Sequence, residues 1–206
     1  MDKGENASYK YTFQLSNPLE TGSSEKGKDE SAEPMKDPSE PKNKGVNNIV
    51  IESQDFYSAL NILESGMSKE PELSHLKVIV FSKELAREGL LEHSSLLFRE
   101  REIRPGVNLC LADNSSDFLF NVKPTLELST ARYYELLFRD QNTPYAPITE
   151  LWDFVSESSD TVSDSVLPVV TENTLSGMGI FHNGIMVAEA DSENAMIYIL
   201  LSGSIF

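Results

Sequence analysis

The chain has 206 residues, of which 39% are hydrophobic, which suits one domain of ordinary size with a buried core. Its formal net charge is −16, and the residues from Asp140 onward include ten acidic side chains and no Lys or Arg. Such a surface repels phosphate groups, which argues against nucleic-acid binding and against docking on anionic membranes. A solvated face that aids solubility, or a contact for a basic partner, accounts for it instead. The sequence has no apolar leader and no run of about 18 apolar residues, so we expect the chain as given to be soluble.

Two strands and a polar segment are predicted in the first quarter of the chain. Apolar and polar side chains alternate from Tyr9 to Leu15, which predicts a half-exposed strand, and Val46 to Ile51 resumes strand character. Between them, residues 19–45 are rich in Ser, Glu, Lys, Asp and Pro, so we expect a disordered loop insertion there. Ser53 is predicted to cap a helix that connects this second strand to the strand at Leu76 to Phe81. The helix carries one apolar stripe: Phe56, Ala59, Leu60 and Leu63.

The segment from Leu73 to Ala112 predicts two buried strands with a helical passage between them. Leu76 to Phe81 is an apolar run with several β-branched residues, which is typical of a strand covered on both faces. Ser82 can cap the next helix, Gly89 suits its left-handed end, and Val107 to Ala112 predicts the second strand. This order predicts parallel strands joined by a right-handed crossover, with Leu76 to Phe81 at the centre of the sheet.

Further helices are predicted beyond residue 112. Ser115 or Ser116 can cap a short helix, and an aromatic stripe marks another helical segment from Thr130 to Phe138. Thr149 can cap a third helix, in which three side chains share a face that we expect to point into the core: Leu151, Trp152 and Val155.

A β-hairpin is predicted near the end of the sequence. Asn183-Gly184 lies between two apolar segments, and this dipeptide is the strongest short-range hairpin signal. Together the elements predict an α/β fold with an α+β tendency. A mixed central β-sheet is flanked by helices and ends in this C-terminal β-hairpin.

Two stretches of the predicted core resemble a known family. The sequence SHLKVIVFSKELAREG begins at Ser74, and LLFREREIR follows from Leu96 before a buried strand. This order of motifs closely resembles the Ger(x)C family of spore germination proteins, the lipoprotein C subunits of nutrient germinant receptors. In that family a lipid-modified cysteine and a first strand precede a GIDK turn, and two further domains follow. The resemblance therefore implies that residues 1–206 are a single N-terminal domain truncated at both ends, with Asp2-Lys3 in the turn.

Residues with catalytic or metal-binding chemistry are isolated from one another. His75, His93 and His182 belong to three different elements, and none has a partner at metal-ligand spacing. Cys110 lies within an apolar strand, where a thiol usually acts as a small core hydrophobe. No nucleophile elbow, phosphate-binding loop or dinucleotide fingerprint occurs. We therefore expect no enzyme, no cofactor and no metal, and interpret His75, which matches the family motif, as structural.

The most unusual local feature is a cluster of arginines at Arg99, Arg101 and Arg104, with glutamates between them. Guanidinium groups bind carboxylates in a bidentate manner. The cluster could therefore be an intramolecular brace, a contact for an acidic partner, or a site for a small anion. The sequence leaves these three alternatives open.

Two functions of different classes follow from the resemblance and from the missing chemistry. The first is a non-enzymatic interaction module in nutrient-triggered germination, which assembles with the A and B membrane subunits of a germinant receptor. The resemblance places the full-length protein on the spore inner membrane through a lipid anchor. The second is an extracytoplasmic domain that binds a small nutrient in a pocket of its own, and an α/β enzyme comes third. The sequence does not decide the oligomeric state.

Overall fold

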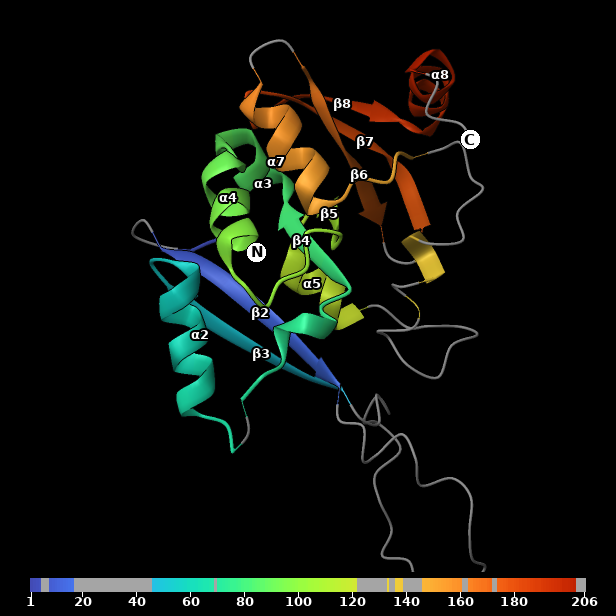
Figure 1. Ribbon diagram of the computed structural model, residues 1–206. Coiled ribbons are helices and arrows are strands. Elements are labelled where there is room, and N and C mark those ends of the chain that lie inside the picture. The colour runs from blue at the N-terminus through green and yellow to red at the C-terminus, as the bar shows by residue number, and fades with distance from the viewer. Residues whose placement is uncertain are drawn as a thin grey trace, which may run out of the picture.

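The computed structural model describes residues 1–4, 8–16, 46–68, 70–121, 133, 136–138, 146–160, 163–171 and 174–202. The predicted loop insertion at residues 19–45 lies outside these residues. Of the predicted aromatic stripe, Tyr134 also lies outside them, whereas Tyr133, Leu137 and Phe138 pack in the core as predicted. Within the described residues, strands form two hydrogen-bonded ladders. Figure 1 shows the first ladder in blue and cyan, below the second.

The first ladder has three antiparallel strands in the order β1-β2-β3, namely β1 (Asp2–Lys3), β2 (Tyr9–Ser16) and β3 (Val46–Ser53). Helix α2 (Phe56–Ser65) follows β3 and buries its predicted stripe of Phe56, Ala59 and Leu63. Its N-cap is Asp55, whose carboxylate accepts a hydrogen bond from the backbone N–H of Ser58 at 2.8 Å. The prediction that Ser53 caps this helix is wrong, because its hydroxyl donates to the Asp55 carbonyl instead.

The second ladder has five strands in the order β4-β5-β6-β7-β8. These are β4 (Val78–Ser82), β5 (Asn108–Ala112), β6 (Ser165–Thr171), β7 (Thr174–His182) and β8 (Ile185–Asp191). The β4-β5 and β5-β6 pairs are parallel, and the other two pairs are antiparallel. The predicted mixed sheet with a C-terminal hairpin is therefore confirmed. Asn183 and Gly184 turn the hairpin with φ values of 50° and 76°, as a two-residue turn with both residues left-handed requires.

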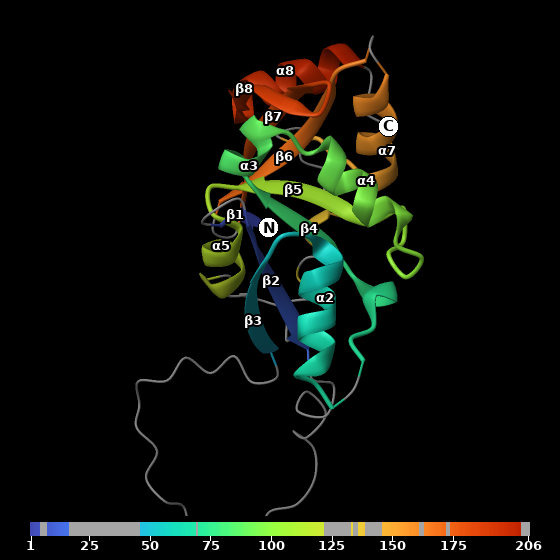
Figure 2. The same cartoon turned by 90° about the vertical axis from the view of Figure 1, so that its left-hand side faces the viewer.

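The predicted crossover between β4 and β5 is also confirmed. Ser82 caps helix α3 (Lys83–Glu88) by accepting from the Leu85 N–H at 3.2 Å. Gly89 ends that helix with φ +130°, a value that L side chains rarely adopt. Helix α4 (Leu91–Arg99) then runs beside α7 (Leu151–Ser159), as the views in Figures 1 and 2 agree.

The strands form two ladders where one sheet was predicted, and β4, predicted at the centre, is the first strand of the five-stranded ladder. Helix α2 follows β3 and precedes β4 in the chain, and β3 pairs antiparallel with β2 along its whole length. The backbone of Met1 joins the two ladders. Its N–H group donates to the Val80 carbonyl, and its carbonyl accepts from the Ser82 N–H at 2.9 Å. This is the hydrogen-bond pattern of parallel strands, and it places β1 between β2 and β4.

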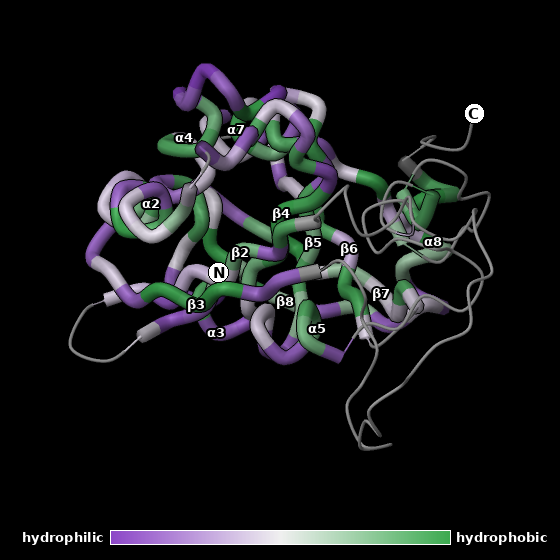
Figure 3. The backbone as a smooth tube through the Cα atoms, turned by 90° about the horizontal axis from the view of Figure 1, so that it is seen from below, coloured by the Kyte–Doolittle hydropathy of each residue, from purple (hydrophilic) through white to green (hydrophobic). Residues whose placement is uncertain are grey.

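Helices cover both faces of the strands. Side chains that alternate along β4 and β5 point to opposite faces, so Phe81 and Leu111 face one core while Val80 and Cys110 face another. The larger core is closed by α2, α3, α4 and α7. The other face is covered by α5 (Ser115–Asn121) and by α8 (Ser192–Ser202). Figure 3 shows β4 and β5 as an apolar band through the centre of the molecule.

The first turn of α5 is held by the Asp2 carboxylate, which lies 113 residues before Ser115 in the sequence. This carboxylate accepts hydrogen bonds from the backbone N–H groups of Ser115 and Ser116, at 2.7 and 3.1 Å. The two serine hydroxyls donate to it as well, at 2.8 and 2.7 Å. The predicted caps Ser115 and Ser116 are thus wrong: Asn114 occupies the cap position, and its side-chain carbonyl accepts from the Asp117 N–H at 3.0 Å.

The predicted cap of α7 is also wrong, and its predicted apolar stripe is right for Leu151 and Val155 but wrong for Trp152. The Thr149 hydroxyl donates to the Val166 carbonyl at 2.7 Å and so ties the chain to β6 instead of capping the helix. Leu151 and Phe154 point into the core with no exposed surface, whereas Trp152 is 53% exposed. The helix therefore presents its tryptophan to the solvent.

Candidate interaction surface

The arginine loop, residues 99–104, connects α4 to the turn that leads into β5. It is fixed from inside by Ile103, which is 3% exposed and belongs to the main core cluster. Two backbone hydrogen bonds shape it, from Ile103 N–H to the Glu100 carbonyl and from Val107 N–H to the Arg104 carbonyl. Arg99, Arg101 and Arg104 are all exposed. A buried apolar side chain thus holds a short loop whose cationic side chains point outward.

The guanidinium groups of this loop have few partners. Among the described residues, no ion pair or hydrogen bond reaches Arg99 or Arg101. The Arg104 Nη2 donates to the Leu76 carbonyl at 3.5 Å, which is a long contact. The chain has 33 acidic and 17 basic side chains, so carboxylates are abundant on it. The predicted intramolecular brace therefore has one long hydrogen bond to support it in the part of the chain that the structure describes.

Trp152 lies between the two ends of the arginine loop. Its backbone N–H donates to the Pro105 carbonyl at 3.0 Å, next to Arg104 in sequence. Its ring centroid is 6.5 Å from that of Phe98, the residue before Arg99. The residues that precede and follow the arginine loop, Phe98 and Pro105, therefore both lie next to Trp152. The sequence prediction missed this residue as a surface group, because Leu151, Trp152 and Val155 also fit one helical stripe.

A family model described as the spore germination protein N-terminal domain matches residues 1–172, which include the arginine loop and Trp152. The chain belongs to this Ger(x)C family. It is 24% identical over 136 residues to the spore germination protein GerQC of Bacillus cereus, a match that covers 64% of this chain and 38% of that protein. No solved structure matches the chain. The chain therefore spans well under half the length of this relative.

His75, which matches the Ger(x)C motif, ends the short 3-10 helix η1 (Leu73–His75) with its side chain 75% exposed. Its Nδ1 lies 3.2 Å from the Ser74 hydroxyl and 3.3 Å from the Glu72 carboxylate. The next residue, Leu76, provides the carbonyl that Arg104 contacts. The two groups of residues that the sequence singled out therefore approach one another at the start of β4.

The other histidines and the cysteine of this Ger(x)C domain are separate from the arginine loop. His93 packs edge-on against Tyr9 with ring centroids 4.5 Å apart, and burial lowers its pKa. His182 pairs with Asp164 at 2.9 Å on the hairpin. Cys110 is fully buried, and burial raises the pKa of its thiol. Within the described ranges, no three His, Cys, Asp or Glu side chains are arranged to hold a metal ion.

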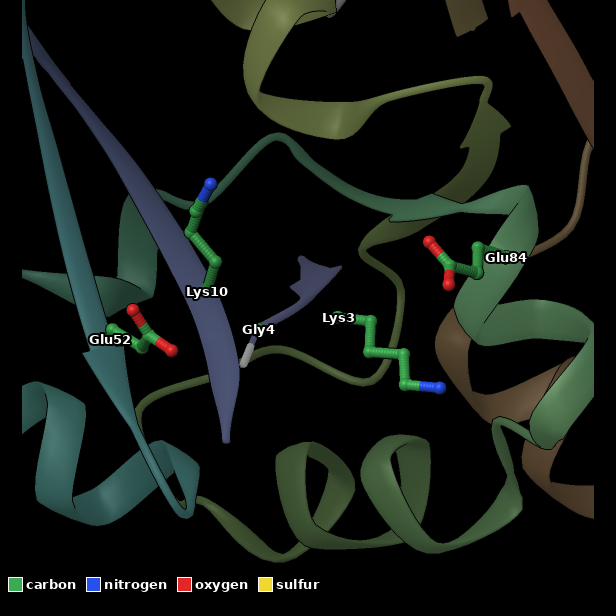
Figure 4. Close-up of a pocket in the computed structure, with 5 residues that line it drawn as sticks. All are labelled: Lys3, Gly4, Lys10, Glu52 and Glu84. Atoms are coloured by element: carbon green, nitrogen blue, oxygen red, sulfur yellow. The ribbon is translucent and has the colours of Figure 1, made fainter. Parts of the chain in front are cut away.

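A cavity of about 350 Å³ opens between β1, β2, β3 and α3 (Figure 4). Lys3, Gly4, Lys10, Glu52 and Glu84 line it. The Lys3 ammonium donates to Glu88, and the Glu52 carboxylate accepts from the Ser8 hydroxyl, so two of the lining charges already have partners. Small-molecule sites usually have predominantly apolar walls, which this cavity lacks. Its lining is instead charged, with two lysines and two glutamates.

Proposed function

We propose that the chain is a non-enzymatic subunit of a spore germinant receptor and that it acts by assembling with the A and B membrane subunits during nutrient-triggered germination. The family membership supports the role in germination. The observation that carries the proposal is the arginine loop, because its exposed guanidinium groups lack carboxylate partners among the described residues of an acid-rich chain. Assembly requires such surfaces and no reaction centre.

The membrane association of the full-length protein is part of the same proposal. In the described residues, no helix has the length and apolar character needed to cross a bilayer. We propose that a lipid anchor holds the full-length lipoprotein on the spore inner membrane, as the family resemblance implies. The acidic part of the chain repels anionic headgroups and so favours attachment through an anchor over attachment through charge.

Co-isolation from spores tests the proposal. The full-length protein, with an affinity tag, is purified from detergent-solubilised spore membranes, and the A and B subunits are identified in the eluate by mass spectrometry. We expect both subunits in the wild-type eluate and much less of them with Arg99→Glu combined with Arg104→Glu. Arg87→Glu is the matched control, because Arg87 is also exposed, at 59%, but lies on α3. Wild-type eluates that lack both subunits would refute the assembly function.

A domain that binds a small nutrient is the second candidate function, and the charged cavity between β1, β2, β3 and α3 is the observation that favours it. Lys10→Ala removes one lining charge without touching the core, since Lys10 is only partly buried. Saturable heat of binding between a germinant and the purified chain, abolished by Lys10→Ala, would place this candidate ahead of assembly. The absence of binding leaves assembly as the better proposal.

A further inference from the structure

The arginine–tryptophan surface consists of Phe98, Arg99, Arg101, Arg104 and Trp152. We propose that this surface binds an acidic segment of a partner protein, with an apolar anchor residue of that segment packed against Trp152 and its carboxylates paired with the arginines. The proposal deepens the assembly function and rests on it for the identity of the partner. The chemistry of the segment follows from the surface alone.

The geometry brings the aromatic and cationic groups together. Residues 99–104 leave α4 next to Phe98, whose ring lies 6.5 Å from the Trp152 ring. They return at Pro105, whose carbonyl accepts from the Trp152 N–H at 3.0 Å. Both ends of the arginine loop are thus fixed to the first turn of α7. A peptide segment with an apolar side chain packed on Trp152 therefore lies next to the loop that carries the three arginines.

The composition of the surface matches that of binding hot spots. Trp and Arg dominate the binding energy at protein interfaces, because each combines a large contact area with a specific polar group. Guanidinium groups bind carboxylates through two parallel hydrogen bonds, and an exposed cation has lost little hydration before the partner arrives. Trp152 is the single tryptophan of the chain and is 53% exposed. Its indole therefore offers apolar area that the fold does not use.

The charge of the rest of the chain narrows the class of partner. At a net charge of −16, the molecule as a whole repels other anions, so attraction of an acidic segment has to come from the local cations. A short segment meets mainly the arginine loop, since screening limits charge effects to about 8 Å at physiological salt. In that loop the three arginines outnumber Glu100 and Glu102. A phosphate-rich bilayer or nucleic acid is extended and meets the acidic regions as well. A protein segment is therefore the occupant that the charges favour.

Selection from a displayed library of random twelve-residue peptides tests this inference on the purified 206-residue chain. The net charge favours capture of basic peptides, so enrichment of acidic ones is a stringent result. We expect enriched sequences with several Asp or Glu residues around one aromatic or large aliphatic residue. Their synthetic forms should bind at least tenfold more weakly to Arg99→Glu combined with Arg104→Glu and to Trp152→Ala, while Arg87→Glu binds as the wild type does.

Fluorescence of Trp152 gives an independent readout, because no other tryptophan contributes to the emission. Binding of an enriched peptide should shift the emission to shorter wavelength and reduce quenching by acrylamide. Enriched peptides without carboxylates, or binding that the arginine reversals leave unchanged, would overturn the proposal. Co-sedimentation with phosphatidylglycerol vesicles that depends on Arg99 would overturn it in favour of a membrane. Self-association that Arg99→Glu abolishes would assign the surface to a second copy.

The experiment separates this inference from the assembly function. If acidic peptides bind as predicted while the A and B subunits fail to co-purify, the surface stands and its proposed partner is wrong. If the subunits co-purify equally well with the arginine reversals, and no acidic peptide is enriched, assembly stands and the surface proposal fails. The two measurements use different material, spores in one case and the purified chain in the other.

Discussion

Asp2 and the arginine loop place charges of opposite sign in opposite environments. Asp2 is 7% exposed, and its carboxylate accepts hydrogen bonds from the N–H groups and hydroxyls of Ser115 and Ser116. Arg99 and Arg101 are exposed, and among the described residues neither has an ion pair. The Asp2 carboxylate is therefore bound by partners inside the fold, whereas the guanidinium groups of Arg99 and Arg101 are exposed to the solvent.

This difference follows from the free energy of hydration. A charge that is removed from water has to be compensated by partners inside the protein, and an uncompensated one costs several kcal/mol. An exposed guanidinium keeps its water and needs no partner. Burial alone would raise the pKa of the Asp2 carboxyl, but the Met1 ammonium and the hydrogen bonds from Ser116 and Ser115 outweigh it and lower that pKa. We therefore expect stability to depend on the buried charge, and the proposed recognition to depend on the exposed ones.

The largest effect is expected for Asp2→Ala. The change leaves two backbone N–H groups and two hydroxyls at the start of α5 without their acceptor, and it loosens the strand that joins the two ladders. We expect the free energy of unfolding to fall by about 3 kcal/mol. Urea denaturation followed by circular dichroism measures it. A loss below about 1 kcal/mol would show that water replaces the carboxylate, in conflict with the burial of the site.

The pH dependence of stability should show the same carboxylate. The folded-state pKa of Asp2 is lowered from its usual value of 3.8, so the folded protein binds the proton more weakly than the unfolded chain does. This contribution to stability is fully present above the unfolded-state pKa and is lost as the pH falls through the folded-state pKa. We expect the difference in unfolding free energy between the wild type and Asp2→Asn to shrink from pH 7 to pH 3. A constant difference would contradict the lowered pKa.

A smaller loss is expected for Lys83→Met, which tests an intermediate environment. The Lys83 side chain is 13% exposed and pairs with Asp113 at 2.9 Å and with Glu189 on β8. Burial acts to lower its pKa, but the two carboxylates outweigh it and raise that pKa. We expect a loss of about 1 to 2 kcal/mol, since methionine retains the packing but not the ion pairs. Arg87→Met, which removes a longer contact to Glu189 at 4.0 Å, is the control and should change stability by less than about 0.5 kcal/mol.

The success of sequence-based prediction differed between local and long-range features. The Ser82 cap, the Gly89 helix end and the Asn183-Gly184 turn are fixed by neighbouring residues, so the local pattern predicted them. Asp2 satisfies donors that lie 113 residues away, and no spacing rule connects two such positions. The β2-β3 pairing was not predicted for the same reason, because residues 17–45 separate the two strands in the sequence.

The candidate surface was predicted in part. The alternation of Arg and Glu from Arg99 to Arg104 marked the arginines from composition alone, but it did not decide whether they are braced. Trp152 was placed in the core because Leu151, Trp152 and Val155 fit a helical stripe as well as Leu151 and Phe154 do. Two stripes that fit equally well are separated only by what lies next to the helix. That neighbour is α4, which lies between β4 and β5 in the chain, whereas α7 lies between β5 and β6.

The smallest effect on stability is expected where the effect on binding is largest. Arg99→Glu combined with Arg104→Glu changes exposed side chains whose only hydrogen bond among the described residues is the 3.5 Å contact from Arg104 to Leu76. We therefore expect the free energy of unfolding to change by less than about 0.5 kcal/mol. Urea denaturation of the purified chain measures it, with Asp2→Ala as the reference for a large loss. A loss above about 1 kcal/mol would show that the arginines brace the fold, because exposed residues without partners have no such effect. An unchanged stability together with lost binding of acidic peptides would instead assign the loop to recognition, which is the distinction that separates it from Asp2.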